Sequence, residues 1–292
     1  MNTWIETYRG SVAPWECDAT EHFTIGYYFD RIGRAELDIA DRLGFGELRQ
    51  AALGARRFAV RFLRELRAGA SFHIESALIG LPAPGAGSGR GSQEGGGLRL
   101  GHRVVDSANG EVVTWIEESW QVPVPAALAA ALAGRLAEWQ GPAIAPRPEP
   151  AGSAGFIVSA RGRAMPADLD DSGLFSLGAF VHRFTDACLQ AAAAIGMDAA
   201  YMHGERRGYS TFELMLGIRG TLRPGEPYCV ETGIAHLGTS SIRLVHRMSD
   251  PRSGQELARL GQFGVQLDLE ARRPAPLPEA IRARAARLLV AA

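Results

Sequence analysis

The chain has 292 residues, of which 46% are hydrophobic, and its 31 Lys plus Arg nearly balance 32 Asp plus Glu, for a net charge of −1. This length and apolar content are enough for a substantial core and exclude a disordered chain. The balanced charge argues against a nucleic-acid binder or a membrane-surface binder, both of which usually carry a positive field.

The first half of the chain predicts a strand, one long helix and four more strands. Apolar side chains recur at helical spacing over residues 25–43, with Thr24 as a suitable N-cap and Gly44 as a suitable stop. Strands are predicted at 3–12, 56–66 and 71–80, and two more within 98–124 are joined by a turn at Asn109-Gly110.

The second half predicts the same order of elements. A strand near 155–163 precedes a helix at 177–195, and further strands follow near 208–222, 226–238, 240–249 and 255–268. The residues rich in Pro and Gly at 146–155 mark the seam between the halves, and 80–97 reads as a flexible surface loop. The tail, 276–292, predicts an amphipathic helix to which we assign no function.

The two halves are also similar residue by residue, which indicates an internal duplication. Trp15–Gly44 aligns without gaps on Ala167–Gly196, and eight of these 30 positions are identical, among them Asp18 with Asp170 and Gly26 with Gly178. A repeat of about 150 residues is a whole domain rather than a solenoid unit. We therefore predict an α+β fold with two repeats, 1–145 and 152–292, each with one long helix and a mainly antiparallel sheet, packed as a pseudo-dimer.

Three cysteines, Cys17, Cys188 and Cys229, are far apart and outside any close-spaced metal pattern. They fit reduced thiols in the cytoplasm better than a disulfide framework. The sequence shows neither a signal peptide nor an apolar run of about 20 residues, so we expect a cytoplasmic protein that does not span a membrane. We expect no metal and no cofactor.

The stretch "ECDATEHFTIGYYFDRIG" places a carboxylate just before a helix start. Asp18 lies six residues before Thr24, so its loop can fold back over the helix N-terminus at Ile25-Gly26-Tyr27. A carboxylate can act as a general base or a nucleophile, and backbone N–H groups at a helix N-terminus can stabilise an oxyanion.

This stretch resembles the entry loop and helix start of hotdog-fold acyl-CoA thioesterases of the 4-hydroxybenzoyl-CoA thioesterase type. Glu16 and Asp18 match the two acids of the family's pattern, His22 its histidine and Tyr28 its aromatic residue, whereas Glu21 replaces the usual Gly and Thr24 the usual Asn. The resemblance covers nearly the whole chain twice and implies a double hotdog that cleaves an acyl-CoA to a free acid and CoA. It also implies that Asp18 is the catalytic carboxylate.

The candidate residues each have a structural alternative. As catalytic residues we name Asp18, His22 and Asp170, although either aspartate can instead hold its loop and His22 can be an ordinary loop histidine. As substrate-binding residues we name a set from the helix start and the following strand, in which the aromatic rings can instead be core and the arginine a surface charge: Thr24, Gly26, Tyr27, Tyr28 and Arg57. His102 and His246, at matching positions of the two halves, are expected to pack in the interior.

Other functions remain open from the sequence. The substituted Gly and Asn of the entry loop favour a non-catalytic acyl-thioester binding module, and a hotdog hydratase or dehydratase is a further alternative whose Asp and His spacing is absent here. The expected partner is an acyl-CoA substrate. The acyl group, the number of competent sites, a coenzyme A or acyl-carrier-protein ester, and further association of the chains are left undetermined.

Overall fold

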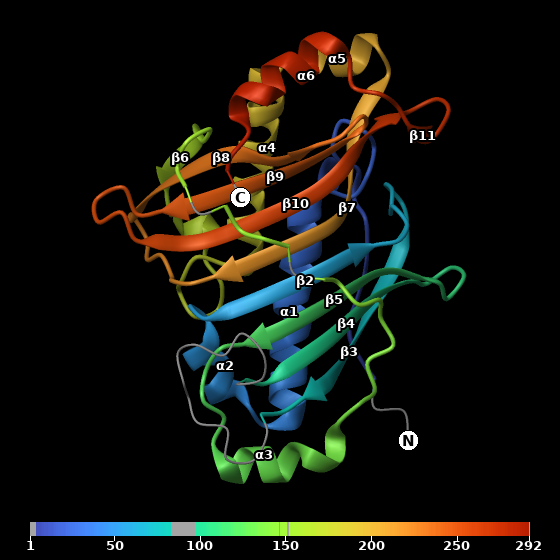
Figure 1. Cartoon of the computed structure of the whole chain (residues 1–292). Coiled ribbons are helices and arrows are strands. Elements are labelled where there is room, and N and C mark those ends of the chain that lie inside the picture. Colours follow the sequence, from blue (N-terminus) through green and yellow to red (C-terminus); the bar gives the residue numbers. More distant parts are fainter. Residues whose placement is uncertain (1–3, 83–96, 146, 151, 292) are drawn as a thin grey trace.

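The computed structural model describes residues 4–82, 97–145, 147–150 and 152–291. The predicted flexible loop at 80–97 therefore falls largely outside the described residues, and so do two positions of the predicted seam. Over the described residues the fold is α+β, as predicted (Figure 1).

The first repeat contains the predicted strands and long helix. Its strands are β1 (Ile5–Ser11), β2 (Arg56–Phe62), β3 (Ser71–Gly80), β4 (Arg99–Asp106) and β5 (Val112–Trp120), and its long helix is α1 (Ile25–Leu43). Gly44 adopts φ 74° and ends α1, as predicted. The second strand is shorter than its predicted range, 56–66, and the helices α2 (Gly46–Ala52) and α3 (Ala126–Leu132) were not predicted.

The second repeat follows the same order. Its strands are β6 (Ile157–Arg163), β7 (Arg207–Ile218), β8 (Pro227–Leu237), β9 (Ser241–Ser249), β10 (Glu256–Asp268) and the short β11 (Arg273–Pro274). Its helices are α4 (Leu177–Ala194), α5 (Ala199–Gly204), which was not predicted, and α6 (Glu279–Ala285) in the tail.

The strands of both repeats join one antiparallel sheet. Within the described residues its order is β1-β3-β4-β5-β2-β7-β10-β9-β8-β6. The two repeats therefore join through β2 and β7, with Ala59 opposite Met215. From the β2–β7 pair outward, equivalent strands follow one another in the same order: β2, β5, β4, β3 and β1 in the first repeat, and β7, β10, β9, β8 and β6 in the second. The predicted pseudo-dimer is therefore a continuous sheet with an approximate two-fold relation about the β2–β7 pair.

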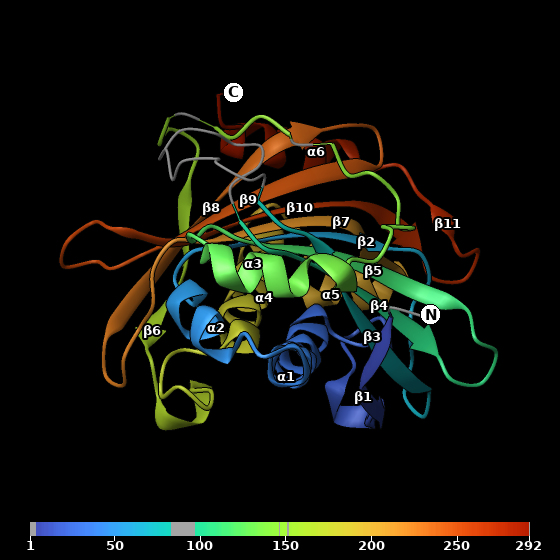
Figure 2. The same ribbon diagram turned by 90° about the horizontal axis from the view of Figure 1, so that it is seen from below.

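The two long helices lie side by side under the curved sheet (Figure 2). A Cβ on Gly26 would lie 2.3 Å from the imidazole of His182, and a Cβ on Gly178 would lie 1.7 Å from the carboxylate of Asp30. His182 Nε2 and Asp30 Oδ2 are themselves 3.0 Å apart. Each helix thus uses a glycine to admit a side chain of the other, and the hydrogen bond between His182 and Asp30 joins them where they cross.

The core runs through both repeats without a break. One cluster of buried residues contains Phe29 and Phe58 from the first repeat and Phe184 and Leu216 from the second. The segment between the repeats crosses the sheet face opposite α1 and α4 (Figure 1), where Arg243 donates to the Pro148 carbonyl at 2.9 Å. The boundaries 1–145 and 152–292 stay a prediction.

Candidate functional site

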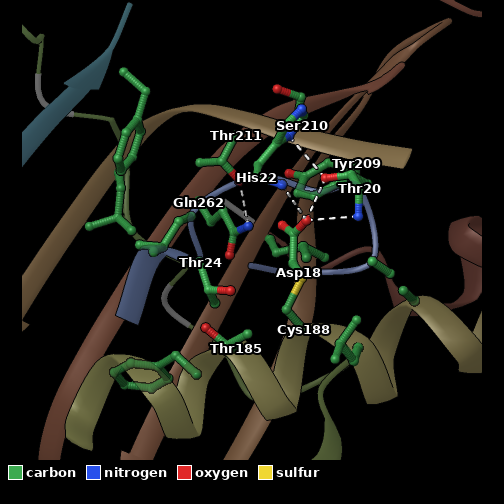
Figure 3. A pocket seen from close by; sticks show the side chains of 18 of the residues that line it. Asp18, Thr20, His22, Thr24, Thr185, Cys188, Tyr209, Ser210, Thr211 and Gln262 are labelled. Atoms are coloured by element: carbon green, nitrogen blue, oxygen red, sulfur yellow. Dashed lines mark hydrogen bonds between the residues drawn. The ribbon is translucent and has the colours of Figure 1, made fainter. Parts of the chain in front are cut away.

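A pocket of about 360 Å³ lies where the two repeats meet. Its mouth is formed by the loop before α1, including Asp18 and Thr20, together with Arg64 and Glu65. Its interior is formed by one face of α4 and by the inner faces of β7, β9 and β10, and most of it is apolar (Figure 3). The first repeat therefore supplies the entrance loop and the second repeat supplies most of the interior.

Asp18 sits at this mouth and holds its own loop. Its Oδ1 accepts hydrogen bonds from the Thr20 N–H at 2.8 Å, from the Thr20 hydroxyl at 2.6 Å and from the His22 N–H at 3.2 Å. Among the described residues Oδ2 accepts no hydrogen bond, so one carboxylate oxygen is fixed and the other is free. Figure 3 shows the carboxylate beside Cys188 of α4.

His22 extends this network away from Asp18. Its Nδ1 is 2.9 Å from the Thr20 hydroxyl oxygen, whose proton goes to Asp18, so Nδ1 donates. Its Nε2 lies 3.0 Å from Glu65, which also pairs with Arg272 at 2.7 Å. Burial opposes ionisation of Glu65, but His22, Arg272 and the Ser210 hydroxyl outweigh it and lower the pKa of that carboxyl.

The N-terminus of α1 points free donors at the pocket wall. Thr24 occupies the N-cap position but its hydroxyl makes no cap bond, and no acceptor for the Ile25 and Gly26 N–H groups is found in the described part of the chain. In α4 the equivalent Ser176 hydroxyl accepts from the Ala179 N–H at 3.0 Å. The Leu177 and Gly178 N–H groups of α4 likewise have no acceptor among the described residues, so the two helix starts differ in how the third N–H is capped, and in that only the α1 start lines the pocket.

The equivalent space in the first repeat is filled by charged side chains. Glu36 is fully buried and accepts from Arg49 at 3.0 Å and from Arg56 at 2.6 Å, and Arg56 lies 3.8 Å from Glu118. Arg49 also reaches across to Asp171 at 3.1 Å. Sequence equivalence puts Cys188 of the pocket at the position of Glu36, so the two interiors have opposite character.

This charged cluster lies next to the loop of Asp170, which was predicted to be a catalytic residue. Asp170 does not line the pocket, and its Oδ1 accepts from the N–H and the hydroxyl of Ser172, as Asp18 does from Thr20. The neighbouring Asp171 is bound by Arg49 and the space beyond is filled, so Asp170 holds its loop and faces no pocket residue; its catalytic role stays a prediction.

Three predicted substrate-binding residues also lie elsewhere. Gly26 is covered by His182, and the ring of Tyr27 packs against the same imidazole at 4.7 Å, so both serve the helix crossing. Arg57 is exposed on the other face of the sheet, because Arg56 and Phe58 on either side of it point inward. Asp18, His22, Thr24 and Tyr28 do line the pocket, and burial raises the pKa of the Tyr28 hydroxyl.

Several pocket residues were not predicted from the sequence. Glu65 lies in the loop after β2, and Cys188, Thr211 and Gln262 come from the second repeat. The offset that pairs His102 with His246 also pairs Glu118 with Gln262, but nothing in either strand marks a polar residue facing a pocket. Only the packing of α4 on the sheet brings these side chains to the entrance loop.

Within the described residues no helix is both long and apolar enough for a membrane span. No group of three or more His, Cys, Asp or Glu side chains is arranged there to hold a metal ion.

Comparison with known proteins identifies the fold. Residues 165–285 match the family model of the Thioesterase-like superfamily. Curated protein sequences gave no significant match.

Three solved structures cover nearly the whole chain. The first, provisionally described as an oleoyl thioesterase from Lactobacillus plantarum, has a TM-score of 0.65 at 14% identity, over 94% of this chain and 97% of its own. An acyl-ACP thioesterase from Bacteroides thetaiotaomicron has a TM-score of 0.64 at 10% identity, over 90% of this chain and 98% of its own. The 12:0-ACP thioesterase from Umbellularia californica has a TM-score of 0.59 at 13% identity, over 91% of this chain and 98% of its own. These matches confirm the predicted double hotdog, and at such identities they concern the fold alone.

Proposed function

We propose that this protein hydrolyses acyl thioesters, with an acyl-CoA as substrate. The observation that carries the proposal is the free N-terminus of α1 beside Asp18, at the mouth of a largely apolar pocket. The family match of the second half and the fold shared with thioesterases support it. The acyl group enters the pocket, and the carrier stays outside the entrance loop.

The chemistry follows from the two groups at the mouth. The free Oδ2 of Asp18 acts as general base toward a water molecule, or as nucleophile toward the thioester carbon. The N–H group of Ile25, at the positive end of the α1 dipole, stabilises the oxyanion that develops on the carbonyl oxygen. Collapse of the tetrahedral species breaks the C–S bond, and in the general-base route the proton that Asp18 took from water passes to the departing thiolate. In the nucleophilic route C–S cleavage leaves an acyl–Asp18 anhydride, which a water molecule hydrolyses to the free acid and the Asp18 carboxylate, while the remaining proton goes to the thiolate. Thr20 and His22, through their bonds to Oδ1 and to each other, hold the carboxylate in place.

The test compares Asp18→Asn with Asp170→Asn, which changes the equivalent residue of the other repeat. We expect Asp18→Asn to lower kcat by at least about a hundredfold, because the amide is neither a base nor a nucleophile. Asp170→Asn is the matched control and should retain wild-type kcat. Release of free thiol from short, long, branched and aromatic acyl-CoA esters is the measurement.

Two results contradict this mechanism. Turnover that survives Asp18→Asn removes Asp18 from the chemistry, and a wild-type protein inactive on the whole panel removes thioester hydrolysis itself. A non-catalytic acyl-thioester binding module is the second candidate, because Asp18 and Asp170 hold their loops in the same way in both repeats. Tight acyl-CoA binding without turnover would favour it.

A further inference from the structure

Four polar side chains interrupt the apolar lining of the pocket. They come from the α1 start, α4, β7 and β10, and we call them the polar wall: Thr24, Thr185, Thr211 and Gln262. Figure 3 shows Gln262, Thr24 and Thr185 pointing toward the same part of the pocket, with Asp18 beside them. Around them the lining is aliphatic or aromatic, so the polar wall is a local feature of the interior.

Gln262 is the most deeply placed member. The residue is 7% exposed, and its Nε2 donates to the Thr211 hydroxyl oxygen at 2.6 Å. Its amide is also linked by side-chain hydrogen bonds to His246 and to Cys188. An amide oxygen has two lone pairs, so Oε1 can accept from a ligand donor in the pocket in addition to His246.

A row of hydrogen bonds lies behind Gln262 in the sheet. The Ser159 and Thr232 hydroxyls are 2.6 Å apart, and Thr232 Oγ1 is 2.7 Å from His246 Nδ1. His246 is fully buried beside Gln262, and its Nε2 has no partner of good geometry in the described part of the chain. This row leaves little freedom for the Gln262 amide to turn away from the pocket.

The first repeat has the same row without the polar wall. Ser76 Oγ is 2.7 Å from His102 Nδ1, and His102 Nε2 is 3.3 Å from Glu118, the equivalent of Gln262. There the row ends on a carboxylate covered by Arg56 and by the Trp120 N–H at 2.6 Å. The row of hydrogen bonds is thus present in both repeats, whereas an amide that faces an open pocket is found only in the second of them.

The geometry points to a substrate class: we propose that the pocket takes an acyl group that carries a hydroxyl on its chain. The hydroxyl donates to Gln262 Oε1, and its oxygen accepts from the Thr24 or Thr211 hydroxyl, because the Thr185 hydroxyl already donates to the Val181 carbonyl at 3.1 Å. A plain hydrocarbon chain would make neither bond, and sites built to bind a hydroxyl reject the analogue that lacks it. This inference rests on the proposed function for its catalytic readout.

The experiment compares kcat/KM for pairs of CoA thioesters that have equal chain length and differ by one hydroxyl, moved along the chain. The wild-type protein should prefer the hydroxylated member of at least one pair by about tenfold or more. Gln262→Leu keeps the side-chain volume and should bring that ratio close to one. Thr211→Val should lower it in part. Gln255→Leu, in the exposed β9–β10 turn, is the matched control and should keep the wild-type ratio.

The same pairs as non-hydrolysable CoA thioethers, measured by calorimetry, separate this inference from the proposed function. If no thioester is turned over, the ratio of Kd values within a pair still tests the polar wall. A ratio near one for every pair in the wild-type protein overturns the inference. The inference is also overturned if Gln262→Leu lowers kcat/KM by the same factor for both thioesters of a pair. Gln262 would then act on the thioester group that both share.

Discussion

Two glycines decide how closely the long helices approach. Gly26 and Gly178 recur at the same place in both repeats, and from the sequence Gly26 was assigned to ligand approach. In the structure a Cβ at Gly178 would meet the carboxylate of Asp30 and lie 3.1 Å from the Asp30 backbone nitrogen. The repetition therefore reflects helix packing, a role that needs the partner helix to be seen.

We expect Gly178→Ala to destabilise the protein by about 1–3 kcal/mol, because the added methyl meets backbone that cannot move aside. Gly33→Ala is the control: no atom lies within 4 Å of a Cβ there, so higher helix propensity should stabilise α1 by up to about 1 kcal/mol. Chemical denaturation of both variants measures the two effects. If both substitutions changed the free energy of unfolding by the same amount, the helix crossing would not depend on Gly178.

Arg57, predicted to bind substrate, shows what strand periodicity determines. The same alternation that predicts buried Phe58 and Val60 puts Arg57 on the opposite face of the strand. The alternation in the sequence was therefore sufficient to predict that Arg57 does not line the pocket. Glu65 and Gln262, by contrast, reach the site through contacts between segments far apart in the chain.

At the scale of elements, the interiors beneath the two halves of the sheet differ in charge. In the first repeat α1, α2, β2 and β5 enclose the cluster of Glu36, Arg49, Arg56 and Glu118. Burial raises the pKa of Glu36 to about 7, against the opposing effect of Arg56. Such a cluster is stable only while its charges are paired.

We expect Glu36→Leu to cost about 3–5 kcal/mol in free energy of unfolding, because it leaves two arginines buried with fewer partners. Asp38→Ala, on the same helix, removes an i,i+4 pair with Arg42 at 2.7 Å that is half-exposed. That control should change stability by no more than about 0.5 kcal/mol. Urea unfolding of the two variants is the measurement, and a neutral Glu36→Leu would mean that the charges are not needed to fill the space.

At the scale of the whole molecule, the two repeats differ in what fills their interiors. The entrance loop of the first repeat serves the interior of the second, while the loop of the second repeat is held by Arg49 against a filled space. An approximate two-fold fold therefore carries a single described pocket of this kind.

We accordingly expect one acyl-CoA thioether to bind per chain, with a stoichiometry near one in calorimetry. The physical reason is that a ligand in the first repeat would have to displace buried, paired charges. Two equivalent sites per chain would contradict this expectation, and Asp171→Ala, which releases Arg49 from the loop, should leave the stoichiometry unchanged.

The sequence by itself determined the repeat, the bounds of α1 and α4 within a residue or two, and the fold class, because these follow from periodicity and from the offset between equivalent residues. It also placed Asp18, His22 and Thr24 together, since they share one loop and helix start. Only the tertiary structure decided which interior stays open, that Asp170 holds a loop, and that Gln262 faces the pocket. Those outcomes depend on side chains such as Glu36 and Arg49, whose pairing joins separate elements and leaves no local pattern in the chain.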